Sequence, residues 1–250
     1  LRLTCIITCI LADYRRDKCE SCTKLCPHKI ALHGLDGAGG RVGNAGLPAD
    51  YRHLTLANSP ARESQPKIYE QLEKYVATFE RMHGDSGDSK PIKSLYLWSK
   101  SPGTGKTTTA IALLNEWIAQ DYLGSLKRGE QPRQTPAVFV DVNDFQTQYN
   151  LATMTNDDEG IAKVGREIKR VQSAYFAVID DIGVRGATEA FRAYLHAIIN
   201  YRATNALPTV YTSNLPIEEM ADVFYERLYD RIRDQCAPIH FEGESKRGRR

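Results

Sequence analysis

The residues with the clearest chemistry lie near the middle of the chain, where glycine, lysine and threonine follow one another closely. Residues 101–107 are Ser-Pro-Gly-Thr-Gly-Lys-Thr, and they come soon after a short apolar segment at 94–98. Glycines let backbone N–H groups turn toward phosphate oxygens, a lysine reaches the terminal phosphates, and a threonine hydroxyl binds Mg²⁺. The pattern therefore predicts a phosphate-binding loop between a strand and a helix.

The residues expected to hold ATP and Mg²⁺ lie in this loop and at the end of a later strand. They are Pro102, Gly103, Thr104, Gly105, Lys106, Thr107, Thr108 and Asp180. One position departs from the usual pattern GxxxxGK[ST], because Lys100 stands where the first glycine is expected. That glycine serves the turn into the loop, so we expect strain or a slightly altered loop at Lys100 and no loss of phosphate binding.

Two further apolar segments end in polar residues suited to ATP hydrolysis. The segment 177–179 is followed by Asp180 and Asp181, and the segment 209–213 is followed by Asn214. Asp180 can hold the Mg²⁺ shell, and Asp181 can orient and deprotonate the attacking water. The Asn214 amide can touch the terminal phosphate or that water. Paired carboxylates at a strand end can also be a solvated turn, but their place after a phosphate-binding loop favours a catalytic site.

Cysteines are concentrated at the start of the chain, with five of the six in the first 26 residues. The spacing predicts a zinc knuckle whose ligands are Cys19, Cys22, Cys26 and His28. Cys9 and His33 are alternatives for the fourth ligand, and a set made only of cysteines would also suit an iron–sulfur cluster. We expect Zn²⁺ in a small module that depends on the metal for folding. Free thiols are the simpler alternative.

The composition is that of a globular protein, with 42% hydrophobic residues, 26% charged residues and a formal net charge of +2. This modest charge excludes a wholly basic protein that coats DNA. The longest apolar stretch, 3–12, is too short to span a bilayer and is not followed by a typical cleavage site. We therefore expect a cytoplasmic protein without a membrane partner.

Apolar segments and helical patterns alternate along most of the chain. An earlier helix that begins near residue 65 is expected to bury one apolar face, because Tyr69, Leu72, Tyr75, Val76 and Phe79 recur at helical spacing. Strands are expected at 94–98, 137–142, 175–179, 209–212 and 238–241, and further helices at 106–120, 159–172, 188–203 and 217–235. This alternation predicts an α/β fold, a parallel sheet with helices on both faces. The glycine-rich run 34–46 predicts a flexible linker. We therefore divide the chain into a metal-binding module at 1–36, a linker at 37–48 and an ATPase domain at 49–250.

Four motifs, at 102–107, 178–183, 212–215 and 226–232, together resemble the AAA+ ATPases of the bacterial DnaC and DnaI helicase-loader type. Residues 46–52 resemble the family's segment near the adenine. The resemblance implies that Asp181 is the catalytic carboxylate and that Asn214 ends the sensor strand. It also implies that Arg231 is an arginine finger, offered to the nucleotide of a neighbouring copy, with Arg227 as the second candidate.

The resemblance also implies the remaining architecture. Nine residues follow Phe241, too few for the helical lid of initiator-type AAA+ proteins, and Arg247 resembles a tail arginine that contacts nucleotide. The cysteine module is similar in kind to the zinc module with which some loaders bind the helicase. A helix in the place of the family's DNA-contacting insertion carries Lys163, Arg166, Lys169 and Arg170, although ordinary surface ion pairs would explain these charges equally well.

The implied function is ATP hydrolysis to ADP and phosphate by a protein that binds the replicative hexameric helicase and loads it onto single-stranded DNA. An IstB-type transposition helper, which serves a transposase on duplex DNA, shares the core and is the alternative. A nonenzymatic adaptor that binds nucleotide statically is a third hypothesis, which Mg²⁺-dependent turnover would exclude. A small-molecule kinase is disfavoured because no lid or acceptor pocket is recognisable. A phage-encoded loader acting on a host helicase is compatible with these residues.

Overall fold

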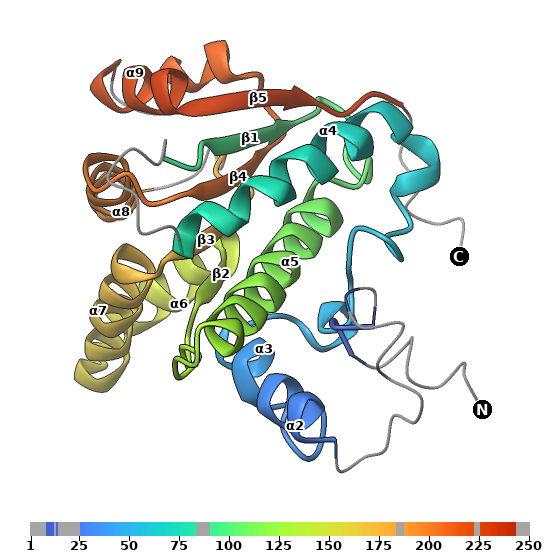
Figure 1. Ribbon diagram of the computed structural model, residues 1–250. Coiled ribbons are helices and arrows are strands. Elements are labelled where there is room, and N and C mark those ends of the chain that lie inside the picture. The colour runs from blue at the N-terminus through green and yellow to red at the C-terminus, as the bar shows by residue number, and fades with distance from the viewer. Residues whose placement is uncertain are drawn as a thin grey trace.

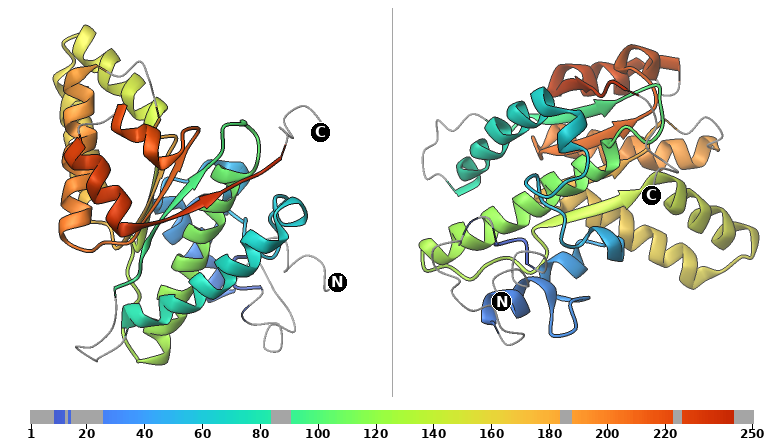
Figure 2. Two further views of the ribbon diagram at one scale, coloured as in Figure 1. Left: turned by 90° about the horizontal axis from the view of Figure 1, so that it is seen from above. Right: turned by 90° about the vertical axis from the view of Figure 1, so that its right-hand side faces the viewer.

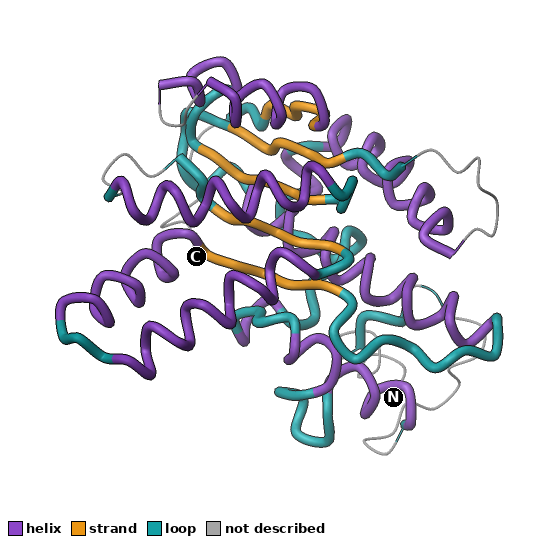
Figure 3. The backbone as a smooth tube through the Cα atoms, turned by 90° about the vertical axis from the view of Figure 1, so that its left-hand side faces the viewer, coloured by secondary structure: helices purple, strands orange, loops and turns teal. Residues whose placement is uncertain are grey.

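A five-stranded parallel sheet forms the centre of the computed structural model, which describes residues 9–12, 14, 26–83, 91–183, 188–222 and 226–243. The strands are β1 (Ser94–Trp98), β2 (Ala137–Asp141), β3 (Phe176–Asp180), β4 (Thr209–Ser213) and β5 (Cys236–His240), in the order β2-β3-β4-β1-β5. Helices cover both faces (Figure 2, Figure 3). The predicted α/β architecture is confirmed, and each expected strand overlaps an observed one.

One face of the sheet is covered by α4 (Pro66–Ala77), the 3-10 turn η3 (Thr78–His83) and α5 (Lys106–Lys127) (Figure 1). The expected apolar face of α4 is buried, and Phe79 continues it beyond the helix end. The Phe79 ring lies 4.9 Å from that of Trp117 on α5, and Trp117 stacks on Phe176 of β3 at 4.8 Å. These aromatic contacts join both helices to the sheet.

The other face is covered by α6 (Val142–Met154), α7 (Asp158–Ser173), α8 (Glu189–Thr204) and α9 (Glu226–Gln235). The sequence analysis does not predict α6, which is rich in Asn, Gln and Thr. It begins at Val142 because the Asp141 carboxylate accepts the backbone N–H groups of Asn143 and Asp144. The helix predicted at 217–235 is two elements, the 3-10 turn η4 (Ile217–Asp222) and α9. None of the described helices has the length and apolar composition needed to cross a membrane.

The N-terminal part of the described chain forms α2 (Pro27–His33), α3 (Gly40–Asn44) and the 3-10 turns η1 (Ala49–Tyr51) and η2 (Arg62–Ser64). The glycine-rich run thus differs from the flexible linker predicted for it, since Val42 and Ala45 are fully buried in the core that α5 shares. The Ala45 carbonyl accepts the Phe139 N–H at 2.8 Å, which places the segment along the outer edge of β2. The division of the chain into domains remains a prediction.

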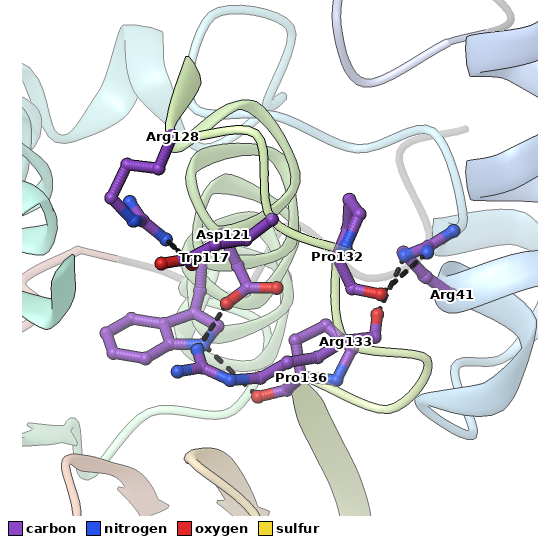
Figure 4. A network of polar contacts seen from close by, with 8 residues as sticks. Arg41, Trp117, Asp121, Arg128, Pro132, Arg133 and Pro136 are labelled. Atoms are coloured by element: carbon purple, nitrogen blue, oxygen red, sulfur yellow. Dashed lines mark hydrogen bonds and ion pairs between the residues drawn. The ribbon is translucent and has the colours of Figure 1, made fainter. Parts of the chain in front are cut away.

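Arg41 of α3 fastens this N-terminal layer to the loop that follows α5 (Figure 4). Its buried guanidinium donates to the carbonyl oxygens of Pro132 and Arg133, at 3.0 and 2.7 Å. Arg133 in turn forms an ion pair with Asp121, a fully buried residue of α5. The loop is therefore attached to α3 through Arg41 and to α5 through Arg133.

Arg202 of α8 is fully buried and is surrounded mainly by backbone oxygens. Its guanidinium donates to the hydroxyl of Thr209 at 2.8 Å and to the carbonyl oxygens of Val171, Ala174 and Pro208 at 2.7, 2.7 and 2.9 Å. Burial lowers its pKa to about 10, so the side chain stays charged at neutral pH. Arg202 thereby joins the end of α7 to the start of β4.

We expect Arg202→Met to lower the free energy of unfolding by about 2–4 kcal/mol, because methionine fills much of the space but leaves these buried carbonyl groups without a donor. Urea denaturation measures the change. Arg166→Met, at an exposed position on α7, is the matched control and should stay within about 0.5 kcal/mol of the unchanged protein. Equal effects of the two substitutions would contradict the role assigned to Arg202.

Candidate active site

The loop between β1 and α5 has the backbone that phosphate binding requires. Gly103 and Gly105 have φ angles of 71° and 101°, in the region that favours glycine. A Cβ atom on Gly105 would lie 2.5 Å from the Cβ of Ala61. Lys100 is not among the described residues with positive φ, and the strain or slightly altered loop expected there remains a prediction. The Lys100 ammonium lies 3.1 Å from the carboxylate of Glu219 in η4.

Lys106 opens α5 and is buried, and its ammonium is surrounded by oxygen atoms. It donates to the Ser101 carbonyl at 3.2 Å and to the Asn214 side-chain oxygen at 3.0 Å. The Thr104 hydroxyl is also buried, and it has no hydrogen-bond partner in the described structure. A buried cation, an unsatisfied hydroxyl and the N-terminus of a helix fit a chain of phosphate groups.

Asp180 lies beside the loop, at the end of β3. Its carboxylate accepts hydrogen bonds from the hydroxyls of Thr107, at 2.9 Å, and Thr212, at 2.6 Å. Burial raises the pKa of Asp180 to about 6; the Thr212 and Thr107 hydrogen bonds oppose this shift, whereas the nearby carboxylates of Asp141 and Asp181 add to it. A carboxylate next to the hydroxyl of Thr107 fits the predicted Mg²⁺ site, because a divalent cation would compensate this buried charge.

Asp181 has a φ angle of 59°, a left-handed conformation that is uncommon outside glycine. Amide groups contact both of its carboxylate oxygens: Asn214 donates to Oδ1 at 3.2 Å, and Asn143 donates to Oδ2 at 2.9 Å. The sequence analysis missed Asn143. Its place just after a buried strand was the available signal, because the carboxyl ends of parallel strands share one edge.

A cavity of about 1400 Å³ brings the predicted nucleotide residues together. Residues 102–108 line it, as do Asp180, Asp181 and Asn214. Residues 46–48, Tyr51 and 60–61 form another part of the wall. This part includes residues of the segment 46–52, whose place near the adenine remains a prediction. Most of the remaining wall comes from β2, α6 and α7. The cavity thus continues from the phosphate loop along the α6–α7 side of the molecule.

Of the predicted arginines, only Arg231 has a described side chain, and it is not brought into this cavity. Arg231 is exposed on α9, does not line the cavity, and donates to the Thr204 hydroxyl at 2.9 Å. The side chain of Arg227 and all of Arg247 lie outside the described part of the chain. A role for Arg231 in the site of a second copy therefore remains a prediction.

The predicted zinc knuckle falls largely outside the described residues, which include neither Cys19 nor Cys22. Cys26 is half-buried, and Nδ1 of His28 lies 2.9 Å from the Tyr122 hydroxyl on α5. Nε2 of His33, the alternative ligand, accepts the N–H of Ile10 at 3.3 Å. In the described ranges no three His, Cys, Asp or Glu side chains converge as a metal site requires. The Zn²⁺ site remains a prediction.

Comparison with known proteins shows likeness to replicative helicase loaders. The chain is 24% identical over 186 residues to the replicative helicase loader DnaI of Bacillus subtilis (strain 168), covering 69% of this chain and 52% of that protein. It is 27% identical over 138 residues to the replicative helicase loader DnaC of Escherichia coli (strain K12), covering 55% and 49%. The chain thus spans about half the length of these curated relatives. No protein-family model matches it.

A solved structure supports the fold. The crystal structure of DnaI superposes with a TM-score of 0.54 and 22% identity, covering 78% of this chain and 95% of that one. With its parallel sheet and its phosphate loop between β1 and α5, the chain has the fold of the AAA+ P-loop ATPases.

Asp180→Asn should stabilise the nucleotide-free protein at pH 7.5, because it removes a buried charge. The raised pKa means that the folded state binds this proton more tightly than the unfolded state, so stability falls as pH rises from about 4 to about 6 and the penalty is complete above that. We expect a gain on the order of 1–3 kcal/mol at pH 7.5 and a smaller one at pH 4.5, measured by thermal unfolding. An equal gain at both pH values would argue against a charge effect.

Proposed function

We propose that this relative of the loaders DnaI and DnaC is an ATPase that loads a replicative hexameric helicase onto single-stranded DNA in the bacterial cytoplasm. The observation that carries the proposal is the convergence of Lys106, Thr107, Asp180, Asp181 and Asn214 at one edge of the sheet. The similarity of the sequence to two helicase loaders supports the choice of partner.

The hydrolysis that we propose uses groups already in place. Lys106 would exchange its contacts with Asn214 and the loop carbonyls for phosphate oxygens of ATP. Thr107 and Asp180 would hold Mg²⁺, which when bound supplies charge neutralisation on the phosphates. Asp181 would orient a water and accept its proton as the water attacks the terminal phosphorus, giving ADP and phosphate. Asn214, released from Lys106, would contact that phosphate or water.

Self-association belongs to the same proposal. Arg231 does not reach the cavity of its own chain, which supports a role toward the nucleotide of a second copy. ATP bound between copies would then stabilise the assembly, and hydrolysis would weaken it and release the helicase on DNA.

The four basic residues of α7 differ in how well their surroundings suit a contact with single-stranded DNA. Arg166 and Lys169 are exposed and do not line the cavity, whereas Lys163 and Arg170 do. Arg170 is engaged with Glu167 and a backbone carbonyl, so it is less suited to a phosphate of DNA. We therefore assign the DNA contact of α7 mainly to Arg166 and Lys169.

The N-terminal part of the chain is the proposed helicase-binding region. The cysteines and His28 would bind Zn²⁺, which would hold a small module together without an open coordination position for chemistry. The transposition-helper hypothesis is not favoured, because the curated relatives that the chain matches are helicase loaders.

Two substitutions separate nucleotide binding from turnover. Lys106→Ala should abolish ATP binding because it removes the buried cation, whereas Asp181→Asn should bind ATP but not hydrolyse it because it removes the base. Equilibrium binding of a fluorescent nucleotide and release of phosphate measure the two properties. Normal turnover in Asp181→Asn would overturn the assignment of Asp181 as the base.

Arg231→Ala should lower turnover by about 10³-fold or more, as loss of an arginine finger does, without weakening nucleotide binding to an isolated subunit. Phosphate release is measured at high protein concentration, and nucleotide affinity is measured at low concentration. A loss of affinity in the isolated subunit would instead place Arg231 in its own site.

The partner is tested by the mass in solution of the protein mixed with a bacterial hexameric replicative helicase, with and without ATP and after removal of metal. We expect a defined complex that is lost when the metal is stripped. If no complex forms although ATP still binds, the loader proposal fails, and duplex DNA with a transposase becomes the next partner to test.

A further inference from the structure

We propose that Arg170 is a positioning residue that couples nucleotide binding in the cavity to binding of a single-stranded nucleic acid on the outer face of α7. The inference rests on the proposed function for its two ligands. It adds the physical connection between their sites, which share the helix α7.

Arg170 joins α7 to the backbone that precedes the first cavity-lining residues. Its Nε and one terminal nitrogen donate to the two carboxylate oxygens of Glu167, at 2.8 and 2.7 Å. The other terminal nitrogen donates to the carbonyl of Asn44 at 2.9 Å. A Cβ atom on Gly46 would lie 3.2 Å from this guanidinium, so backbone and side chain are in close contact. The two hydrogen bonds to one carboxylate fix the plane of the guanidinium. A displacement of α7 would therefore be passed through Arg170 to the backbone at Asn44 better than through a flexible contact.

The backbone at residues 44–46 leads directly into the cavity wall. Gly46 lines the cavity with Leu47 and Pro48, and its φ angle of 81° turns the chain at this point. The segment is also attached to the loop before β2 and to β2 itself: the Asn44 amide donates to the Gln134 carbonyl at 3.1 Å, and Ala45 accepts the Phe139 N–H. A shift of α7 relative to β2 therefore acts on the wall that would face the bound nucleotide.

The helix α7 presents different residues to the cavity and to the solvent. Lys163, Val164, Glu167 and Arg170 line the cavity, whereas Arg166 and Lys169 are exposed and lie outside it. The helix is 16 residues long, and Val164 and Val171 are buried in the core. In this proposal α7 acts as one rigid element, so a strand bound on the outer cations and a nucleotide bound inside would both act on its position.

Coupling between two ligands is reciprocal. If ATP raises the affinity for the strand by a certain factor, the strand must raise the affinity for ATP by the same factor, commonly about 5- to 150-fold. The size of this factor distinguishes a coupling residue from one that only stabilises the fold, since a structural residue would weaken either ligand without changing the factor.

The experiment uses the full chain, a fluorescently labelled oligothymidylate and a nonhydrolysable ATP analogue with Mg²⁺. The affinity for the strand is measured with and without the analogue, and the affinity for a fluorescent analogue is measured with and without the strand. We expect the two ratios to agree and to exceed about fivefold in the unchanged protein. In Arg170→Lys, which keeps the charge but loses the paired hydrogen bonds to Glu167, we expect both ligands to bind and both ratios to fall to about one.

Lys169→Ala is the matched control, because it removes an adjacent exposed cation. It should weaken strand binding equally with and without the analogue and leave the ratio unchanged. Thermal unfolding shows whether Arg170→Lys folds, and Glu167→Gln provides a second test if it does not. Loss of the ion pair in Glu167→Gln should reduce the ratio of strand affinities measured with and without the analogue.

The outcomes separate this inference from the proposed function. If the unchanged protein binds no strand, the DNA partner of the proposed function is lost, and the inference falls with it. If the unchanged protein binds both ligands with ratios of one, or if Arg170→Lys or a folded Glu167→Gln keeps the full ratio, only the inference is overturned.

Discussion

The close approach of Gly105 to Ala61 is the constraint on which the rest of the structure depends. There is no room for a side chain at this turn, so the phosphate loop and the chain around Ala61 must pack as one unit. Buried polar groups on α5 continue that attachment. Thr109 lies 2.9 Å from the Tyr69 hydroxyl, and the Asn115 amide donates to the Leu54 carbonyl at 2.8 Å. The helix that begins at the phosphate site thus also positions the opposite wall of the cavity.

The cavity contains a buried carboxylate whose charge is poorly compensated. Asp180 is buried with two hydroxyl donors and no contacting cation among the described side chains. By contrast, the buried charge of Asp121 has its arginine partner. Such an arrangement costs stability in the absence of a ligand. It is common where a site is built to bind one, because the ligand supplies the missing charge.

Local spacing predicted much of this protein. The phosphate loop, the acids at the end of β3 and the amphipathic face of α4 depend on residues close in sequence, and the sequence analysis found each of them. It missed α6, which starts because the Asp141 side chain caps it, and it predicted a flexible linker where α3 packs on the core. These features depend on tertiary contacts. Arg202 is a further example, because an arginine on a helix is normally solvated and only the fold surrounds it with carbonyl groups.

The two edge strands of the sheet, β2 and β5, each have a feature that hinders pairing with a further strand. Ala45 occupies a backbone donor of β2 that would otherwise be available to a strand of another molecule. At the opposite edge, the backbone N–H of Phe241 donates to the Trp98 carbonyl of β1. The backbone groups of alternate residues of β5 therefore point away from β1, toward the open side. Pro238 is one of these residues, and its nitrogen carries no hydrogen to donate to a further strand. Both edges are therefore poor templates for strand addition.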